Sequence, residues 1–231
     1  MITLYGPSQA PFTEKVRRAL IYKNVEFELC EPQTLEDYKR WSPKTGMLPV
    51  LDLHGEHVPD STDILLRLDV LYPEPPLLSS DANVAQQQRQ LEDWADVSFL
   101  WYYMKYLHLT SRDVPLPVAL DGELVDAAEE RSARRPPSVW RWIRAWIRAG
   151  GTWERPLTGL LRELGDRVDD LVNFLGGRAF FYADQLSMAD LAVYSMLNVM
   201  RGDVVPGSAT VLAQRPTLVA LMARVEAVTG G

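Results

Sequence analysis

The stretch that decides the fold is LPVLDLHGEHVPDSTDIL, residues 48–65. It contains two short β-prone runs, PVLDL and HVPD, and the polar turn between them predicts a β-hairpin. Ser, Thr and Asp then precede an apolar pattern at helical spacing, in which we expect Ile64, Leu65, Leu68 and Leu71 to face inward. The stretch therefore predicts a hairpin that leads directly into a capped helix.

The sequence before this stretch predicts a β-α-β order. Residues 2–6, ITLYG, form a short β-prone run, and apolar residues then recur at helical spacing over residues 11–23. Apolar and polar residues alternate over residues 25–32, VEFELCEP, as they do in a half-buried strand. A polar stretch separates this strand from the hairpin. Residues 1–78 therefore form one predicted α/β domain.

The rest of the chain predicts helices only. A segment rich in Pro and Ser, PEPPLLSSDAN, marks the junction, so we assign residues 79–86 to a linker and the start of the first bundle helix. Apolar stripes at helical spacing follow over residues 84–109 and 160–175. Residues 87–231 are therefore predicted to form an all-helical domain.

The clearest local signal in this second domain is QLSMADLAVYSMLNVM, residues 185–200. Ser187 at the N-cap and Asp190 three residues later can satisfy each other's backbone donors as a capping box. The helix that they open is apolar nearly all round. We therefore expect this helix to lie buried at the centre of the helical domain.

Composition narrows the class of protein. The 231 residues carry 24 Lys and Arg against 31 Asp and Glu, a net charge of −7, which argues against a nucleic-acid-binding chain. The single cysteine, Cys30, excludes an internal disulfide framework and fits a reducing compartment. No leader pattern or apolar run of about 20 residues is visible, so we expect a cytoplasmic location. His54, His57 and His108 lack ligand spacing, so we expect no metal site.

Together these features resemble the glutathione transferase family. The pieces that carry the resemblance stand in family order: LYGP at residues 4–7, PFTEKVRRAL at 11–20, the deciding stretch, and DQLSMADLAVYSML at 184–197. The resemblance implies an α/β thioredoxin-like N-terminal domain, an all-α helical-bundle C-terminal domain and a cytoplasmic homodimer. It also implies that the thiolate of glutathione, the co-substrate, attacks a small hydrophobic electrophile, as in detoxification.

The resemblance implies a glutathione-binding role for four residues of the deciding stretch. Pro49 corresponds to the family's cis-proline, and the backbone of Leu48 corresponds to the one that pairs with the cysteinyl part of glutathione. Asp60 and Ser61 match the acidic-Ser pair that receives the γ-glutamyl end, where a helix N-terminus suits a carboxylate and an acid suits an ammonium. From the residues alone, an alternative is that Ser61 caps a helix and Asp60 favours its dipole.

Two positions depart from the family pattern. Many members carry Ser or Cys just before the helix that starts with the Pro-Phe pair, and Ala10 occupies that place here. The nearest catalytic substitutes are Ser8 and the amide of Gln9, although Ser after Pro commonly serves only in a turn. The helix dipole and backbone N–H groups can still favour a thiolate without a hydroxyl. Met47 stands where Lys or Gln often contacts the glycyl carboxylate, so Lys44 becomes the candidate for that contact.

The electrophile pocket is expected beside the helix predicted over residues 84–109. In the family this helix lines the electrophile site, so the resemblance assigns Tyr102 and Tyr106 to the pocket, together with Phe12 from the first helix. A phenol there can donate to a developing negative charge. Aromatic packing in the core is the alternative interpretation of such a stripe.

The family does not explain the segment VWRWIRAWIRAGGTWER, residues 139–155. A basic, Trp-rich helix over Trp140–Arg148 can lie at a membrane surface. It can equally be a bundle helix whose arginines meet acidic neighbours or a second subunit, which the net negative charge favours. Two alternatives to a transferase therefore stay open. One is a membrane-surface protein, and the other is a non-catalytic binding or scaffold protein in which Ala10 marks a lost active site.

Overall fold

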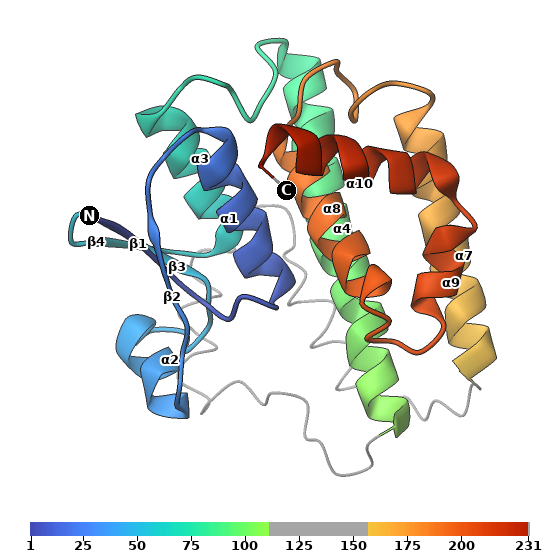
Figure 1. The fold of residues 1–231 in the computed structure, drawn as a ribbon, viewed down its shortest axis with the longest axis horizontal. Coiled ribbons are helices and arrows are strands. Elements are labelled where there is room, and N and C mark those ends of the chain that lie inside the picture. The colour runs from blue at the N-terminus through green and yellow to red at the C-terminus, as the bar shows by residue number, and fades with distance from the viewer. Residues whose placement is uncertain (111–156, 231) are drawn as a thin grey trace.

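The computed structural model describes residues 1–110 and 157–230, and its first part is a four-stranded sheet with two helices on one face (Figure 1). The strands follow the order β2-β1-β3-β4; β1 pairs parallel with β2 and antiparallel with β3. Their bounds are β1 Ile2–Tyr5, β2 Glu28–Cys30, β3 Val50–Leu53 and β4 Glu56–Pro59. The helices of this part are α1 Pro11–Tyr22, α2 Leu35–Trp41 and α3 Ser61–Leu71. The predicted thioredoxin-like order is therefore confirmed.

The hairpin predicted from the deciding stretch is present between β3 and β4. Leu51 lies opposite Val58 and Leu53 opposite Glu56, which leaves a two-residue turn. His54 and Gly55 in this turn have φ values of 58° and 96°, the left-handed conformation that such tight hairpin turns require. The turn thus fixes the register between β3 and β4, and the chain continues from β4 into α3.

The core of this part lies between the sheet and the helix pair α1 and α3, which run side by side in the same direction (Figure 1). Leu4 and Leu51 face the helices from the sheet, and both are completely buried. The predicted inward residues Ile64, Leu65 and Leu68 of α3 are also completely buried. The apolar face that these residues form on α3 therefore packs into the core.

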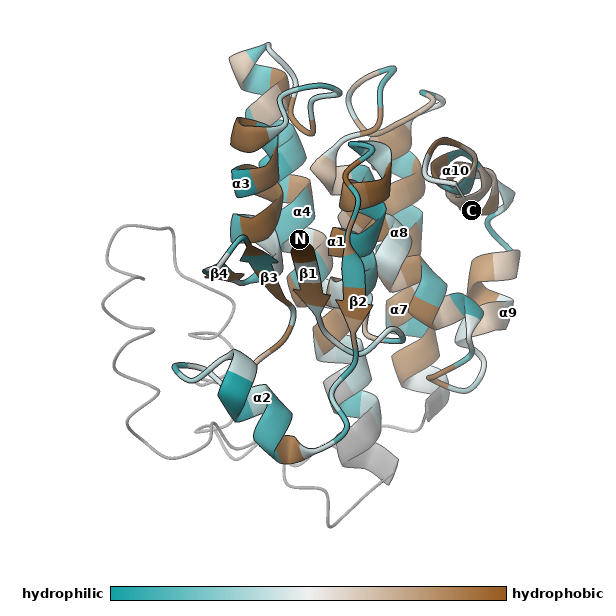
Figure 2. Cartoon of the chain, turned by 60° about the vertical axis from the view of Figure 1, so that its left-hand side comes forward, coloured by the Kyte–Doolittle hydropathy of each residue, from teal (hydrophilic) through white to brown (hydrophobic). Residues whose placement is uncertain are grey.

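Three details of the sequence prediction need correction. The second strand covers only β2, Glu28–Cys30, because the preceding residues approach the sheet without ladder pairing. Leu71 is 45% exposed, since it is the last residue of α3 and lies beyond the sheet. The polar stretch before the hairpin contains α2, which Figure 2 shows as almost wholly hydrophilic.

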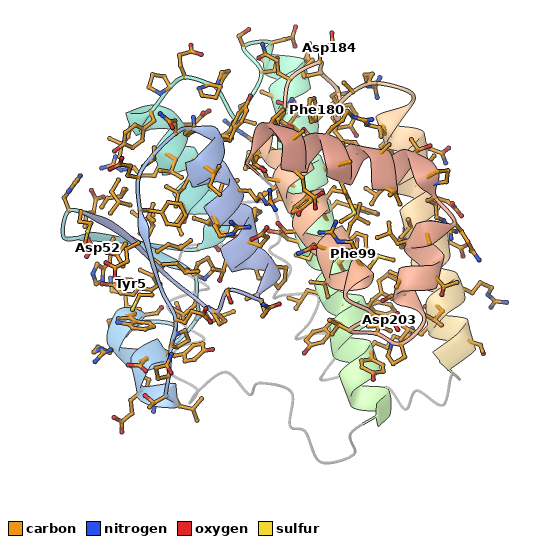
Figure 3. The ribbon with its side chains drawn as sticks, viewed as in Figure 1. Tyr5, Asp52, Phe99, Phe180, Asp184 and Asp203 are labelled. Carbon is orange, nitrogen blue, oxygen red and sulfur yellow. The ribbon has the colours of Figure 1, made fainter. Side chains whose placement is uncertain are left out.

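Helix α2 lies on the opposite face of the sheet from α1 and is anchored by an aromatic stack. Side chains alternate along β1, so Tyr5 faces away from buried Leu4. The Tyr5 ring stacks on Trp41 of α2 with ring centroids 4.7 Å apart (Figure 3). Trp41, the last residue of α2, thus anchors this polar helix to the sheet.

The second part consists of helices around a buried central one. Their bounds are α4 Ala82–Thr110, α7 Leu157–Leu175, α8 Met188–Arg201, α9 Ser208–Ala213 and α10 Pro216–Val228. Helix α8 contacts α1, α4, α9 and α10, and most of its side chains are buried, which confirms the predicted central position. In the described ranges, 1–110 and 157–230, no helix is long and apolar enough to span a membrane.

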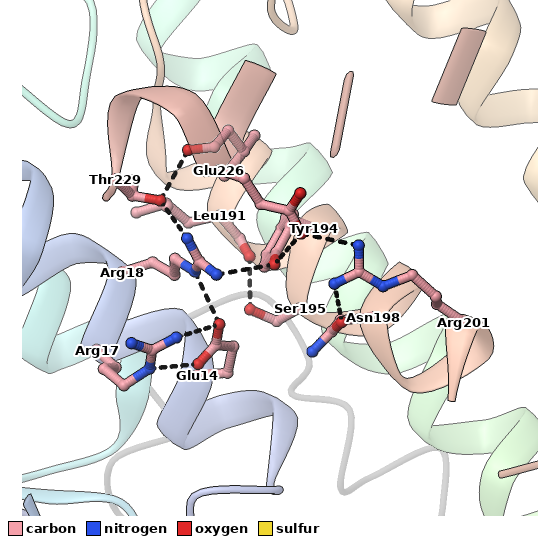
Figure 4. Close-up of polar contacts among 11 residues, drawn as sticks. Glu14, Arg17, Arg18, Leu191, Tyr194, Ser195, Asn198, Arg201, Glu226 and Thr229 are labelled. Carbon is pink, nitrogen blue, oxygen red and sulfur yellow. Dashed lines mark hydrogen bonds and ion pairs between the residues drawn. The ribbon is translucent and has the colours of Figure 1, made fainter. Parts of the chain in front are cut away.

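Two buried cations fix the region where the two parts meet: Lys23, just after α1, bonds the end of the first part, and Arg18 on α1 bonds the second. The Lys23 ammonium donates to Asp69 Oδ1 at 2.8 Å and to the backbone oxygens of Tyr72 and Pro75 at 2.6 and 2.8 Å, which holds the segment that follows α3. Arg18 reaches across to α8 and to Thr229 near the C-terminus (Figure 4). The division at residues 78 and 87 stays a prediction.

Candidate functional site

The loop between β1 and α1 brings Ser8 and Gln9 to the start of the first helix. The Ala10 N–H donates to the Pro7 oxygen at 3.0 Å, so Ser8 and Gln9 are the central residues of a tight turn. Ser8 is half-buried and Gln9 is exposed. Ser8 therefore has the turn position that its sequence allowed, two residues before the N-cap of α1.

Ala10 is the N-cap of α1, as predicted, and contributes no side-chain cap. Its backbone is extended, with φ −77° and ψ 133°, and its oxygen accepts the first helical hydrogen bond from Glu14 at 2.9 Å. Among the residues that the structure describes, no acceptor bonds the N–H groups of Phe12 and Thr13. Thr13 is completely buried and Phe12 is half-buried, so of these two donors only the Phe12 N–H, at the positive end of the helix dipole, belongs to a residue that a ligand can contact.

Gly6 lets the strand pass close behind this helix turn. Its N–H donates to the Cys30 oxygen at 3.1 Å, and a Cβ at this position would collide with the side chain of Thr13. Thr13 is completely buried. The backbone at Gly6 therefore fixes where the first turn of α1 lies.

The chain enters β3 through Leu48 and Pro49, whose peptide bond is cis, as the resemblance implies. Leu48 is half-buried, and no described residue forms a backbone hydrogen bond with it. The loop before it is closed by hydrogen bonds from Gly46 N to Ser42 O and between the Ser42 and Thr45 hydroxyls, both 2.7 Å. Lys44 is exposed at the tip of this loop, so its contact with a ligand stays a prediction.

Asp60 and Ser61 lie at the N-terminus of α3. The capping alternative made Ser61 the cap, but the residue that caps the helix is Asp60. Asp60 is the N-cap, and its Oδ1 accepts from Thr62 N at 2.9 Å and Asp63 N at 3.3 Å. Its backbone φ of 73° is unusual for a non-glycine residue. Ser61 is the first helical residue, and it is only 6% exposed.

A buried charge cluster, which was not predicted from the sequence, lies between α1, α3 and α4. The Lys15 ammonium is 2.7 Å from both Glu92 Oε1 and Asp96 Oδ2. Glu92 Oε1 also accepts from the Thr62 hydroxyl at 2.7 Å. Glu92 and Asp96 are four residues apart on α4, and this spacing is the only local signal of the cluster.

Burial controls the electrostatics of this cluster. It raises the pKa of Asp96 to about 7, helped by the negative charges of Glu92 and Asp60, although Lys15 opposes the change. The two carboxylates in turn raise the pKa of Lys15 against the effect of its burial. Asp96 Oδ1 is buried without a hydrogen-bond partner among the described residues. The cluster therefore sets two carboxyl groups against one ammonium beside the start of α3, and burial disfavours the negative charge of Asp96.

The aromatic residues assigned to the electrophile pocket lie along α1 and α4. The Phe12 ring is half-buried, and its centroid lies 5.5 Å from Lys15 Nζ. Tyr102 is buried against α7, where its hydroxyl donates to the Glu163 oxygen at 3.1 Å, and burial raises its pKa. Tyr106 is half-buried on the same helix. The structure thus turns Tyr102 toward α7, and a shared pocket with Phe12 stays a prediction.

A cavity of about 490 Å³ lies beside Tyr102. It is lined by Val97, Ser98, Trp101, Tyr102, Glu163, Asp166 and Arg167, from α4 and α7. Its volume suits a small organic ligand. None of the residues assigned to the thiol or the peptide lines it, so the cavity and the proposed thiol position are separate features of the described structure.

The structural cap at α8 forms as the sequence predicts. Asp190 Oδ2 accepts from the Ser187 N–H at 2.8 Å and from its hydroxyl at 2.7 Å, while Oδ1 accepts from Phe181 N at 2.8 Å. Burial raises the pKa of Asp190 to about 6, against the effect of these hydrogen bonds. The segment 139–155 lies outside the described residues. Within the described residues, no group of three or more His, Cys, Asp or Glu is placed to hold a metal ion.

Two models of known protein families match the sequence. Residues 4–76 match the family model described as "Glutathione S-transferase, N-terminal domain". Residues 162–230 match the model described as "Glutathione S-transferase, C-terminal domain". The chain belongs to the glutathione S-transferase superfamily.

Two curated relatives resemble this glutathione S-transferase family member. "Failed axon connections" of Drosophila melanogaster is 23% identical over 206 residues, which cover 83% of this chain and 46% of that protein. "Glutathione S-transferase Z2" of Arabidopsis thaliana is 35% identical over 86 residues, which cover 35% of this chain and 38% of that protein. The matched regions therefore span less than half the length of either relative.

Solved structures of the family share the fold. A Tau class glutathione S-transferase from mango, Mangifera indica, has a TM-score of 0.66 at 18% identity, covering 98% of this chain and 88% of the other. A glutathione S-transferase from Methylobacterium radiotolerans in complex with glutathione sulfonate has a TM-score of 0.63 at 24% identity, covering 98% and 90%. At these identities the similarity concerns the fold.

Proposed function

We propose that this glutathione S-transferase family member binds glutathione and holds its thiolate at the N-terminus of α1. The observation that carries the proposal is the uncapped first turn of that helix. The N–H group of half-buried Phe12 has no acceptor among the described residues, and the methyl group of Ala10 does not compete for it. This directed donor and the positive end of a helix dipole favour a thiolate over a thiol.

The opposite end of the tripeptide belongs at the N-terminus of α3. We assign the Ser61 hydroxyl and backbone N–H to donate hydrogen bonds to the γ-glutamyl carboxylate at a helix start. Asp60 uses Oδ1 to cap the helix. Its second oxygen is then available to the γ-glutamyl ammonium. This assignment gives Asp60 a structural role and a binding role at once.

The middle of the tripeptide belongs beside Leu48. A peptide that adds to the end of a sheet needs backbone groups that the protein itself does not use. Leu48 forms no backbone hydrogen bond with any residue of the described ranges. We assign it the cysteinyl part of glutathione, and we assign the glycyl carboxylate to Lys44 on the exposed loop.

The proposed reaction is attack of the bound thiolate on a small hydrophobic electrophile. The thiol proton passes to solvent, the sulfur forms a bond to the electrophilic carbon, and the leaving group departs with the electron pair of the bond that breaks. Ser8 and Gln9, in the turn before α1, are the side chains that we assign to stabilise the thiolate. Phe12, Tyr102 and Tyr106 are proposed to contact the electrophile.

A non-catalytic binding protein is the second candidate function. Ala10 supplies no hydroxyl or thiol where a side chain would activate the sulfur, and this observation favours binding without turnover. Both candidates require glutathione binding, so measured turnover with a chlorinated aromatic electrophile separates them. A thiol that stays protonated in the complex would support the second candidate.

The first experiment measures retention on immobilised glutathione and the heat of glutathione binding. Asp60→Ala should abolish both, because it removes the proposed partner of the ammonium. The matched control is Asp81→Ala, since Asp81 caps α4 with bonds to Asn83 N at 2.9 Å and Val84 N at 3.0 Å, away from the site. Unchanged retention of the Asp60 variant would contradict the assignment.

A cytoplasmic location, a homodimer and a role in detoxification also belong to this proposal. A single cysteine supports a reducing compartment. Sedimentation at several protein concentrations tests the dimer directly. A sedimenting mass that stays at one chain would exclude the homodimer and leave the binding proposal intact.

A further inference from the structure

The buried charge cluster connects the two helices whose N-termini form the proposed glutathione site. Lys15 lies on α1, one turn after the first residue of that helix, and its side chain is completely buried. A buried ammonium is tolerated only when it is closely paired. Its partners, Glu92 at 1% exposure and Asp96, both belong to α4.

Glu92 carries the connection onward to α3. The Oε1 atom that accepts from Lys15 at 2.7 Å also accepts from the Thr62 hydroxyl at 2.7 Å. Thr62 is the second residue of α3, directly after Ser61, and its own N–H donates to Asp60. One buried oxygen therefore ties the beginning of α3 to the second turn of α1.

We propose that Lys15, Glu92 and Thr62 are positioning residues that hold the N-termini of α1 and α3 at the separation that one glutathione molecule spans. This inference rests on the proposed function, since it concerns a ligand held at both helices. None of the three side chains needs to touch the ligand. Their role is to keep one helix end in place when the ligand binds at the other.

The location of the cluster supports this role over a general contribution to stability. A hydrogen bond from Thr62 to a charged, buried carboxylate is stronger than one to a neutral acceptor. It acts at the first turn of α3, where a small rotation would displace Ser61. The Thr62 hydroxyl forms the only side-chain hydrogen bond between α3 and Glu92 in the described structure.

The test uses Thr62→Val, which removes the hydroxyl and keeps the shape and the Lys15 pair. Calorimetry with glutathione measures affinity, and thiolate absorbance against pH measures the pKa of the bound thiol. We expect affinity to fall about tenfold and the pKa of the bound thiol to rise, although the substitution lies at the other end of the ligand. Thr62→Ser should restore both values because it keeps the hydroxyl.

The matched control is Thr217→Val. Thr217 is exposed and is also the second residue of its helix, α10, so the substitution repeats the local change away from the site. It should leave both measurements unchanged. Should Thr62→Val fail to fold, Thr62→Ala, which adds no methyl group, replaces it.

The outcomes separate this inference from the proposed function. A wild-type chain that gives no heat with glutathione contradicts the proposed function itself. If the wild type binds and Thr62→Val binds equally well, the positioning role is wrong. A variant that loses affinity while the pKa of the bound thiol stays at its wild-type value also overturns it, because the effect is then confined to one helix end.

Discussion

The guanidinium of Arg18 on α1 lies over the ring of Tyr194 on α8 at 4.8 Å and donates to its hydroxyl at 3.0 Å. The same hydroxyl donates to Glu226 Oε1 at 2.9 Å, and Arg18 also donates to Glu14 and Thr229 (Figure 4). The first helix is thus bonded to the centre and to the end of the helical part. This contact predicts that the two parts unfold together.

Tyr194→Phe should lower the free energy of unfolding by about 1–2 kcal/mol, because it leaves one buried donor of Arg18 without a partner. Urea unfolding followed by circular dichroism measures the change. Tyr38→Phe is the control, since Tyr38 lies on the polar helix α2 and should change stability by less than about 0.5 kcal/mol. Equal stability of the Tyr194 variant and the wild type would show that the hydroxyl contributes nothing.

Asp190→Ala should be more damaging than Ser187→Ala. The first change leaves the buried N–H groups of Phe181 and Ser187 without an acceptor and should cost about 2–5 kcal/mol. The second removes one capping bond and should cost about 1 kcal/mol. Thermal unfolding of both variants gives the order, and a reversed order would contradict the capping geometry.

The stability of the chain should depend on Asp96 between about pH 4 and pH 7. Its pKa is raised from 3.8 to about 7 in the folded chain, where Lys15, Glu92 and Asp60 face it, so folding takes up a proton in this range. Its contribution to stability is therefore complete below pH 3.8 and is lost as the pH rises through about 7.

Asp96→Asn should remove this dependence. The wild type should lose stability relative to the variant as the pH rises across the range, which urea unfolding at several pH values measures. Asp184→Asn, an exposed change, is the control and should leave the wild-type profile intact. Parallel profiles for the wild type and Asp96→Asn would mean that Asp96 ionises normally.

Ala10→Ser should stabilise α1. The N-cap backbone is already extended, so a hydroxyl can accept from a first-turn N–H and add about 1 kcal/mol. The same substitution at exposed Ala220, inside α10, should instead lower stability by a few tenths of a kcal/mol, roughly the difference in helix propensity. If both variants melt at the wild-type temperature, the first turn of α1 already has its acceptors.

The features that the sequence predicted are those with local signals. The Ser187–Asp190 capping box and the turn at Gly55 depend on residues within a few positions of one another, so spacing reveals them. Lys15 is different, because its partner Glu92 is 77 residues away and only the packing of three helices brings them together.

Helix α2 was missed for another reason. Its face toward the sheet offers little apolar periodicity, and the only local signal is the capping box from Thr34 to Asp37. Its position depends on Trp41 meeting Tyr5, a contact between two distant aromatic residues. Similarly, Tyr102 belongs to a stripe that spacing identifies, but only the position of α7 decides which way its hydroxyl points.

The bond from Arg18 to Thr229 joins residues 211 positions apart. During synthesis the first helix leaves the ribosome long before this partner exists. Until Thr229, the residue that follows α10, has emerged, the buried Nη1 of Arg18 lacks its Thr229 acceptor. Helix α1 is therefore completed by a residue that is made 211 positions later, and release of the chain before Thr229 would leave Arg18 without this partner.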